Sequence, residues 1–404
     1  MATRVDPKLM LDLEKFGAHD ARKCYQCGTC TAVCPHADEL WSFPRKPIQT
    51  ARLGFADRLD QSLEPWLCYY CGDCSERCPR GAEPGEMMMS LRRWLTSRYD
   101  ITGLSRLFYR SGAAEVLAMV LVGLAAAGGF LAYGLLSGHR LGTYDGPHAF
   151  LPWHVIHRFD WSMAGVLTFF LAINSSRMWW WTTGSGPRVK VPLSAYFKKL
   201  PLIPLQFFTQ SRYAACGRKR SYLVHLGLML SYVTLFVLIM FFLHRMQSGP
   251  AIDWRVHGLG YLAGLGLLVT VIVSLRGRAT QAAPLDRRSH ESDWIFLVML
   301  LLTALTGFTQ HVLHRVGLDV AANVAYVVHL GFVVPLLVLE VPFGKWSHMV
   351  YRPLALYLAE VQREALAVRG VPARQPAELP SGIRTPIPSP AAAEPVTAPP
   401  AGLP

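Results

Sequence analysis

The chain is polar at its start, apolar through its middle, and rich in proline and alanine at its end. A helix needs about 20 apolar residues to cross a bilayer. Six stretches have this character, and each predicts a membrane-spanning helix: 113–136, 159–181, 222–243, 257–275, 294–312 and 320–343. We therefore expect a polar domain over 1–105, a membrane domain of about six helices over 106–360, and a Pro/Ala-rich disordered tail over 361–404.

The composition agrees with a membrane protein. Of the 404 residues, 51% are hydrophobic and 17% are charged, which is too apolar for a soluble protein of this length. A soluble helical bundle would not need apolar stretches this long, nor tryptophans at their ends. The second stretch is the least apolar because it contains Asn174 and Arg177. This arginine can extend to a membrane interface marked by Trp179, Trp180 and Trp181.

Basic residues in the loops predict the orientation of the helices. The loops after the second and fourth stretches contain twelve lysines and arginines, and the loops on the opposite side contain five. Positively charged loops stay in the cytoplasm, so we expect both termini on the cytoplasmic side of the inner membrane. The net charge of +13 fits this pattern. It does not predict nucleic-acid binding, because no basic face interleaves with aromatics on a soluble domain.

Eight of the nine cysteines form two runs with the same spacing, C-x2-C-x2-C-x3-C-P. This spacing is typical of ferredoxins with two [4Fe–4S] clusters, in which the fourth cysteine of each run binds the other cluster. We therefore assign cluster one to Cys24, Cys27, Cys30 and Cys78, and cluster two to Cys68, Cys71, Cys74 and Cys34. The ninth cysteine, Cys216, is predicted to be a reduced thiol without a role.

Other uses of the cysteines fit the spacing less well. Structural zinc prefers four ligands in two separated pairs. A disulfide framework is typical of short secreted chains. Gly28 and Gly72 follow the second cysteine of each run, where we expect the backbone to turn close to inorganic sulfide. The pattern thus favours an electron-carrying domain in a compartment where thiols stay reduced.

Four histidines have a spacing that suits haem binding. His225 and His244 lie 19 residues apart at the ends of the third stretch, and His329 and His348 have the same spacing around the sixth. Nineteen helical residues rise about 28 Å, close to the thickness of a bilayer core. The two stretches run antiparallel, so His225 pairs in depth with His348, and His244 with His329. Two pairs predict two haems, of the non-covalent b type because no C-x-x-C-H motif is present.

Alternatives remain for the outer haem. Residues 19 apart on one helix point about 100° away from each other, so the helices must tilt or cross. His311 is a second candidate ligand at this depth, and other histidines lie near it: His154, His157, His257 and His314. Each of these histidines could instead make ordinary hydrogen bonds at the interface. Possible quinone contacts lie near the end of the last stretch: Glu340, Lys345 and Trp346.

Several segments resemble known families. CYQCGTCTAVCP (24–35), FPRK (43–46) and WLCYYCGDCSERCPRGAEPGE (66–86) resemble the HdrC-type subunit of heterodisulfide reductases. HLGFVVPLLVLEVPFGKWSHMVYRP (329–353) and SYLVHLGLMLSY (221–232) resemble the haem-binding helices of the nitrate reductase gamma subunit and its HdrE-type relatives. The order of the two parts resembles the QmoC-type subunit of quinone-interacting membrane-bound oxidoreductases, the Qmo complexes.

The resemblance implies a mainly α fold, with a cytoplasmic α-helical two-[4Fe–4S] ferredoxin domain followed by a six-helix transmembrane cytochrome b domain. It implies that His225 and His348 bind the inner haem b and that His329 binds the outer one. The family's further histidine is missing at 231–235, so His244 or His311 would complete the outer site. It also implies HdrA-like flavoprotein subunits, menaquinone as substrate, and adenylylsulfate reductase as a partner.

The expected function is electron transfer between the quinone pool, haem b, the two clusters and a cytoplasmic flavoprotein. One alternative is the membrane electron-transfer subunit of a heterodisulfide reductase-like complex. The chain has no CCG-type cysteine set, so disulfide reduction would belong to another subunit. A second alternative is a structural membrane anchor of a cytoplasmic enzyme, without haem.

Overall fold

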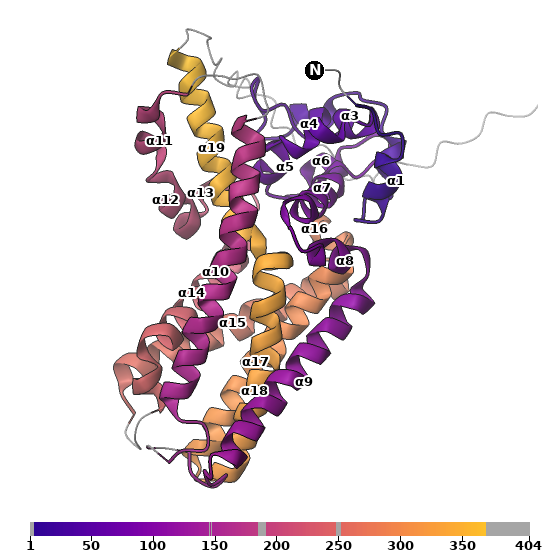
Figure 1. Ribbon diagram of the computed structural model, residues 1–404. Helices are drawn as coiled ribbons and strands as arrows, with labels where there is room; N and C mark the ends of the chain where they lie inside the picture. Colours follow the sequence, from indigo (N-terminus) through magenta and orange to yellow (C-terminus); the bar gives the residue numbers. More distant parts are fainter. Residues whose placement is uncertain (1–3, 145, 147, 185–190, 248–251, 369–404) are drawn as a thin grey trace, which may run out of the picture.

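The computed structural model describes residues 4–144, 146, 148–184, 191–247 and 252–368. Within these ranges the chain is helical or irregular, and no strand occurs (Figure 1). Most of the predicted disordered tail lies outside the described residues. Its first part does not behave as predicted, because residues 361–368 continue the last helix, α19 (His348–Val368). Val361 and Ala365 of this helix are buried, and their burial explains why the helix extends this far.

The N-terminal domain is built from short helices around one apolar core. Trp66, Phe16 and Phe43 are fully buried there, together with Met88 and Leu91. The elements are α1 (Leu9–Glu14), η1 (Ala21–Lys23), α2 (Thr29–Ala32), α3 (Arg45–Arg52), α4 (Ala56–Asp60), α5 (Glu64–Leu67), α6 (Asp73–Glu76), α7 (Pro84–Tyr99) and α8 (Leu104–Arg110). The longest of these, α7, begins with a proline, whose fixed backbone angle suits a first helical turn.

Five helices are long and apolar enough to cross a membrane, and they match five of the six predicted stretches. They are α9 (Gly112–Leu136), α14 (Lys219–Gln247), α15 (Trp254–Thr280), α17 (Glu291–Arg315) and α18 (Asp319–Phe343). The sixth stretch forms α10 (Trp153–Gly184), which is the longest helix but is less apolar. Its four charged or amide side chains explain the difference: Arg158, Asp160, Asn174 and Arg177.

The helix α10 runs along the whole bundle (Figure 1). Near its start, Ile156 packs with Leu243 and Tyr326 at the end remote from the N-terminal domain. Near its other end, Met178 belongs to the same core as Trp66 of that domain. The chain thus returns along α10 to the side of the N-terminal domain before α14 begins.

Short helices gather at the domain end of the bundle (Figure 1): α11 (Leu193–Lys199), α12 (Leu202–Thr209), α13 (Ser211–Ala214), α16 (Pro284–Arg287) and η2 (Lys345–Ser347). The last membrane-length helix ends before His348, contrary to the assumption that His329 and His348 lie on one helix. The break occurs at Gly344, where a side chain would overlap the carboxylate of Glu340. The Lys345 amide bonds to that carboxylate at 2.6 Å instead of continuing the helix.

Candidate functional site

The two cysteine runs follow the same backbone path. Gln26 and Tyr70, which precede the second cysteine of each run, have left-handed φ angles of 64° and 55°. Gly28 and Gly72 have φ angles of 90° and 89°, and each caps a one-turn helix that carries the third cysteine. A left-handed position favours glycine because it lacks a Cβ. The repeated spacing in the sequence therefore produces a repeated loop.

Backbone amides in these loops point at sulfur atoms. The Gln26 N–H donates to Cys24 Sγ at 3.4 Å, and the Tyr70 N–H donates to Cys68 Sγ at 3.3 Å. The Ala82 N–H donates to Cys78 Sγ at 3.3 Å. Hydrogen bonds of this kind stabilise negative charge on a thiolate and tune the potential of a cluster.

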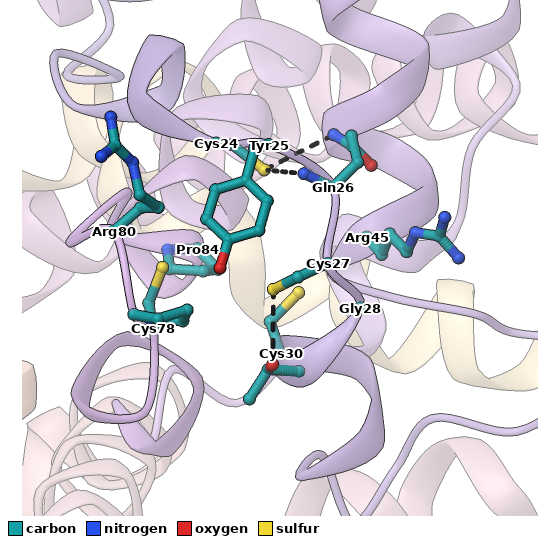
Figure 2. A pocket seen from close by; sticks show the side chains of 12 residues that line it. Cys24, Tyr25, Gln26, Cys27, Gly28, Cys30, Arg45, Cys78, Arg80 and Pro84 are labelled. Carbon is teal, nitrogen blue, oxygen red and sulfur yellow. Dashed lines mark hydrogen bonds between the residues drawn. The ribbon is translucent and has the colours of Figure 1, made fainter.

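The first pocket combines both runs. Cys24, Cys27 and Cys30 line it together with Cys78 from the second run. Figure 2 shows the four side chains around one space, with Tyr25 beside them. Arg45 and Arg80 also line the pocket, and no carboxylate does. Four soft sulfur donors without oxygen ligands are the donor set of an iron–sulfur cluster.

The second group of thiols is more deeply enclosed. Burial, and then the neighbouring Cys68, raise the pKa of Cys34 to about 12. Burial also raises the pKa of Cys74 well above its usual value, with Cys68, Cys71 and Cys34 as the next causes. Thiols in such a place ionise when a bound cation supplies compensating charge. Cys34 of the first run thus lies with the three thiols of the second.

The ninth cysteine lies beside this second group, although the sequence suggested no role for it. Cys216 is hydrogen-bonded to Cys71, and its Sγ lies 3.3 Å from His36 Nε2. Tyr69 and Tyr213 enclose it in a small apolar core. Nothing in the sequence around residue 216 signals this contact, because it joins positions 145 residues apart.

His225 and His348 face each other across a pocket at the domain end of the bundle. Their ring centroids are 6.2 Å apart and their planes make an angle of 61°. A bond from an imidazole nitrogen to a metal is about 2 Å long, so two rings sharing one ion have centroids about 6 Å apart. The His225 Nδ1 is bonded to Gln210 Oε1 at 2.8 Å, and the His348 Nδ1–H donates to the Lys345 carbonyl. Each Nε2 is left to bind the ion, an arrangement common among metal-ligating histidines.

The other walls of this pocket include Tyr69, Phe207, Met229 and Arg352. Burial and the Arg352 guanidinium lower the pKa of His348 well below its usual value, so its imidazole is neutral. A neutral imidazole is the form that ligates metals. Apolar walls with two facing imidazoles fit a haem b.

The outer histidines are not gathered in the same way. His329 Nδ1 lies 2.9 Å from Thr306 Oγ1, while the His244 ring packs on Trp153 with centroids 4.6 Å apart. His311 Nε2 is hydrogen-bonded at 2.6 Å to a tyrosine hydroxyl of α15. Among the described residues no ring contact joins His329 to His244 or His311. The outer haem therefore stays a prediction.

The candidate quinone contacts near residue 345 interact within the protein. Lys345 is paired with Asp293, and its amide is bonded to Glu340. The Trp346 ring packs on Tyr232, with centroids 4.1 Å apart. These contacts give the three side chains a structural role in closing the bundle against the N-terminal domain.

Comparisons with known proteins address the N-terminal part. A family model for a 4Fe-4S dicluster domain matches residues 20–82. An HdrC-like heterodisulfide reductase protein from Archaeoglobus profundus is 32% identical over 121 residues, covering 29% of this chain. The chain spans 64% of the length of that curated relative. No solved structure matches the chain. The chain thus contains an iron–sulfur electron-transfer domain related to the HdrC component of heterodisulfide reductase, joined to five helices that could span a membrane.

Proposed function

We propose that the protein is the membrane-anchored electron-transfer subunit of a quinone-linked oxidoreductase complex. In this proposal electrons pass between a quinone such as menaquinone, haem b, the two clusters and a cytoplasmic HdrA-like flavoprotein. The 4Fe-4S domain and the apolar helices support the two halves of the proposal. The resemblance of the membrane half to quinone-linked cytochromes b supports the quinone, the flavoprotein, and adenylylsulfate reductase as a possible partner.

The cofactor ligands follow from the two groups of thiols and the facing histidines. Cys24, Cys27, Cys30 and Cys78 would hold cluster one, and Cys68, Cys71, Cys74 and Cys34 would hold cluster two. His225 and His348 would hold a haem b, and His329 is retained as a ligand of an outer haem. Clusters and haem supply one-electron chemistry when bound, while the protein positions them and sets their potentials.

The observation that carries the proposal is the shared wall between the second cysteine run and the histidine pocket. Tyr69, the neighbour of Cys68, lines that pocket. Arg352 lines it as well, and donates a hydrogen bond of 2.8 Å to the Cys68 carbonyl. Cluster two would therefore lie next to the haem, and cluster one would lie farther out, on the side open to a soluble partner.

The same arrangement favours six membrane passes with both termini in the cytoplasm. Helix α10 returns the chain to the domain end, so it would supply the sixth pass (Figure 1). The basic loops lie at this end, where Arg218 binds Asp73 at 2.7 Å and Glu76 at 2.8 Å on α6. The cluster domain would thus be held against the cytoplasmic face.

The test is spectroscopy of the purified full-length protein. We expect eight cluster irons for each haem-loaded chain and reduced b-type bands that respond to a quinol analogue. A protein with clusters but without haem would overturn the electron-transfer route and leave a membrane anchor. Haem that is reduced by a flavoprotein partner but never by a quinol would favour the heterodisulfide reductase-like alternative.

A further inference from the structure

Two buried glutamates meet where the membrane helices reach the cluster domain. Glu115 lies in the first turn of α9 and Glu340 in the last turn of α18, and each is 1% exposed. Their carboxyl groups are hydrogen-bonded to each other. Among the described residues no N–H or O–H group of another side chain reaches Glu115 Oε1 or Oε2, or Glu340 Oε1.

This arrangement requires a proton on the pair. A carboxylate is an acceptor only, so a hydrogen bond between two carboxyl groups needs one of them in the acid form. Two adjacent buried charges of like sign would also repel each other. In addition, each would lose hydration at a cost of several kcal/mol. The pair therefore holds at least one proton.

Charged groups from several elements surround the pair. Asp293 of α17 binds Lys345 of η2, and lies 3.6 Å from Arg278 of α15 and 3.8 Å from Arg93 of α7. Arg93 also binds Glu86 at 2.8 Å. Other titratable groups at the border are Tyr109 of α8, Asp286 of α16 between Arg278 and Arg220, and Glu291, which accepts the Gly112 N–H at 3.0 Å.

The buried charges balance when the pair carries one proton. Three cations, Arg93, Arg278 and Lys345, face two carboxylates, Glu86 and Asp293. One negative charge on the glutamate pair makes this set neutral. A second proton would leave an excess positive charge, which becomes favourable when a negative charge is added nearby.

Such a charge can arrive at the histidine pocket. His348 Nδ1–H donates to the Lys345 carbonyl, and the Lys345 N–H donates to Glu340 Oε2 at 2.6 Å. The contact depends on Gly344, because a side chain there would overlap Glu340 Oε2. One residue thus links the proposed haem ligand to the glutamate pair through hydrogen bonds.

We propose that Glu115 and Glu340 form a proton-binding site whose occupancy follows the redox state of the haem at His225 and His348. The inference rests on the haem of the proposed function. When a quinol or a cluster delivers one electron to the haem, one proton from the cytoplasm binds the pair, and an acid and a carboxylate become two acids. When the electron leaves, that proton is released, so charge is conserved in both directions.

The first experiment measures the haem midpoint potential of the full-length protein at several pH values around neutrality. We expect the wild-type equilibrium to change toward tenfold per pH unit, which is about 59 mV for one electron. The Glu115→Gln/Glu340→Gln variant should lose most of this dependence. Asp160→Asn, which alters a buried carboxyl of α10, should keep it. The same slope in the double variant and the wild type would overturn the proposal.

Infrared spectroscopy gives a second measurement that does not require haem. The carbonyl band of a protonated carboxylic acid should be present in the wild type and should disappear in the double variant. It should grow on reduction of the haem. If the double variant does not fold, each single glutamine variant tests the same band. A band unchanged by these substitutions would overturn the proton site, whereas absence of haem with the band present would overturn the proposed function and the redox link only.

Discussion

Arg352 donates a hydrogen bond of 2.8 Å to the carbonyl oxygen of Cys68, and so ties α19 to the second cysteine run. Its guanidinium lies over the Tyr69 ring, 4.4 Å from the centroid. Because Arg352 also lines the pocket of His225 and His348, one side chain borders both proposed redox sites. Its positive charge favours an added electron at either site.

Replacement of Arg352 by methionine should lower the midpoint potential of cluster two. Loss of the cation should change the ratio of reduced to oxidised cluster about tenfold, or about 59 mV for one electron. Potentiometric titration followed by electron paramagnetic resonance would measure each cluster. Arg80→Met is the matched variant, because Arg80 lines the first pocket and should affect cluster one. Equal effects of both variants on both clusters would contradict the proposed placement.

Replacement of Cys78 by serine should damage the cluster whose other ligands are Cys24, Cys27 and Cys30. We expect about half of the cluster iron to be lost, with the signal of the other cluster retained. Cys34→Ser should have the reciprocal effect. Iron analysis and electron paramagnetic resonance would separate the two results, and loss of cluster two alone from the Cys78 variant would refute the crossed assignment.

Replacement of His348 by alanine should remove the inner haem while both clusters remain. A haem iron that loses one of two imidazoles from a protein pocket loses most of its anchorage, so we expect less than about a tenth of the wild-type haem. The pyridine haemochrome spectrum and the iron content would measure this. His19→Ala, on the exposed surface, is the control. Normal haem content in the His348 variant would contradict the ligand assignment.

Replacement of Cys216 by alanine should lower the potential of cluster two without loss of iron. The thiol is hydrogen-bonded to Cys71, and a donor to a ligand sulfur stabilises the more negative, reduced state. Cys216→Ser keeps a donor and should restore most of the potential. If the alanine variant instead lost cluster two, Cys216 would be a ligand and the assignment of Cys34 would be wrong.

Much of the fold was predictable because membrane length and cysteine spacing are local properties of a sequence. Five of the six apolar stretches are helices long and apolar enough to span a membrane. The repeated spacing produced repeated loops, with Gly28 and Gly72 at equivalent left-handed positions. The sixth pass was harder to predict, because α10 carries polar side chains and because packing at both of its ends, rather than its hydropathy, defines its path.

Positions that depend on distant contacts were predicted less well. The sequence suggested one helix through His329 and His348, but the chain breaks at Gly344, where Glu340 needs the space of a side chain. The last helix extends to Val368 because it packs on other parts of the protein. Pairing of outer histidines by depth alone ignored rotation about each helix axis, and their observed neighbours are Trp153, Thr306 and Tyr261.

The sequence by itself determined that this protein joins an iron–sulfur domain to apolar helices, because spacing and composition act within one segment. Only the tertiary structure placed Cys216 beside Cys71, Arg352 against Cys68, and Glu115 against Glu340. Each of these pairs joins residues far apart in the chain. Their contacts arise when the membrane helices pack against the cluster domain, and burial at that boundary gives the charges and protons there their effect.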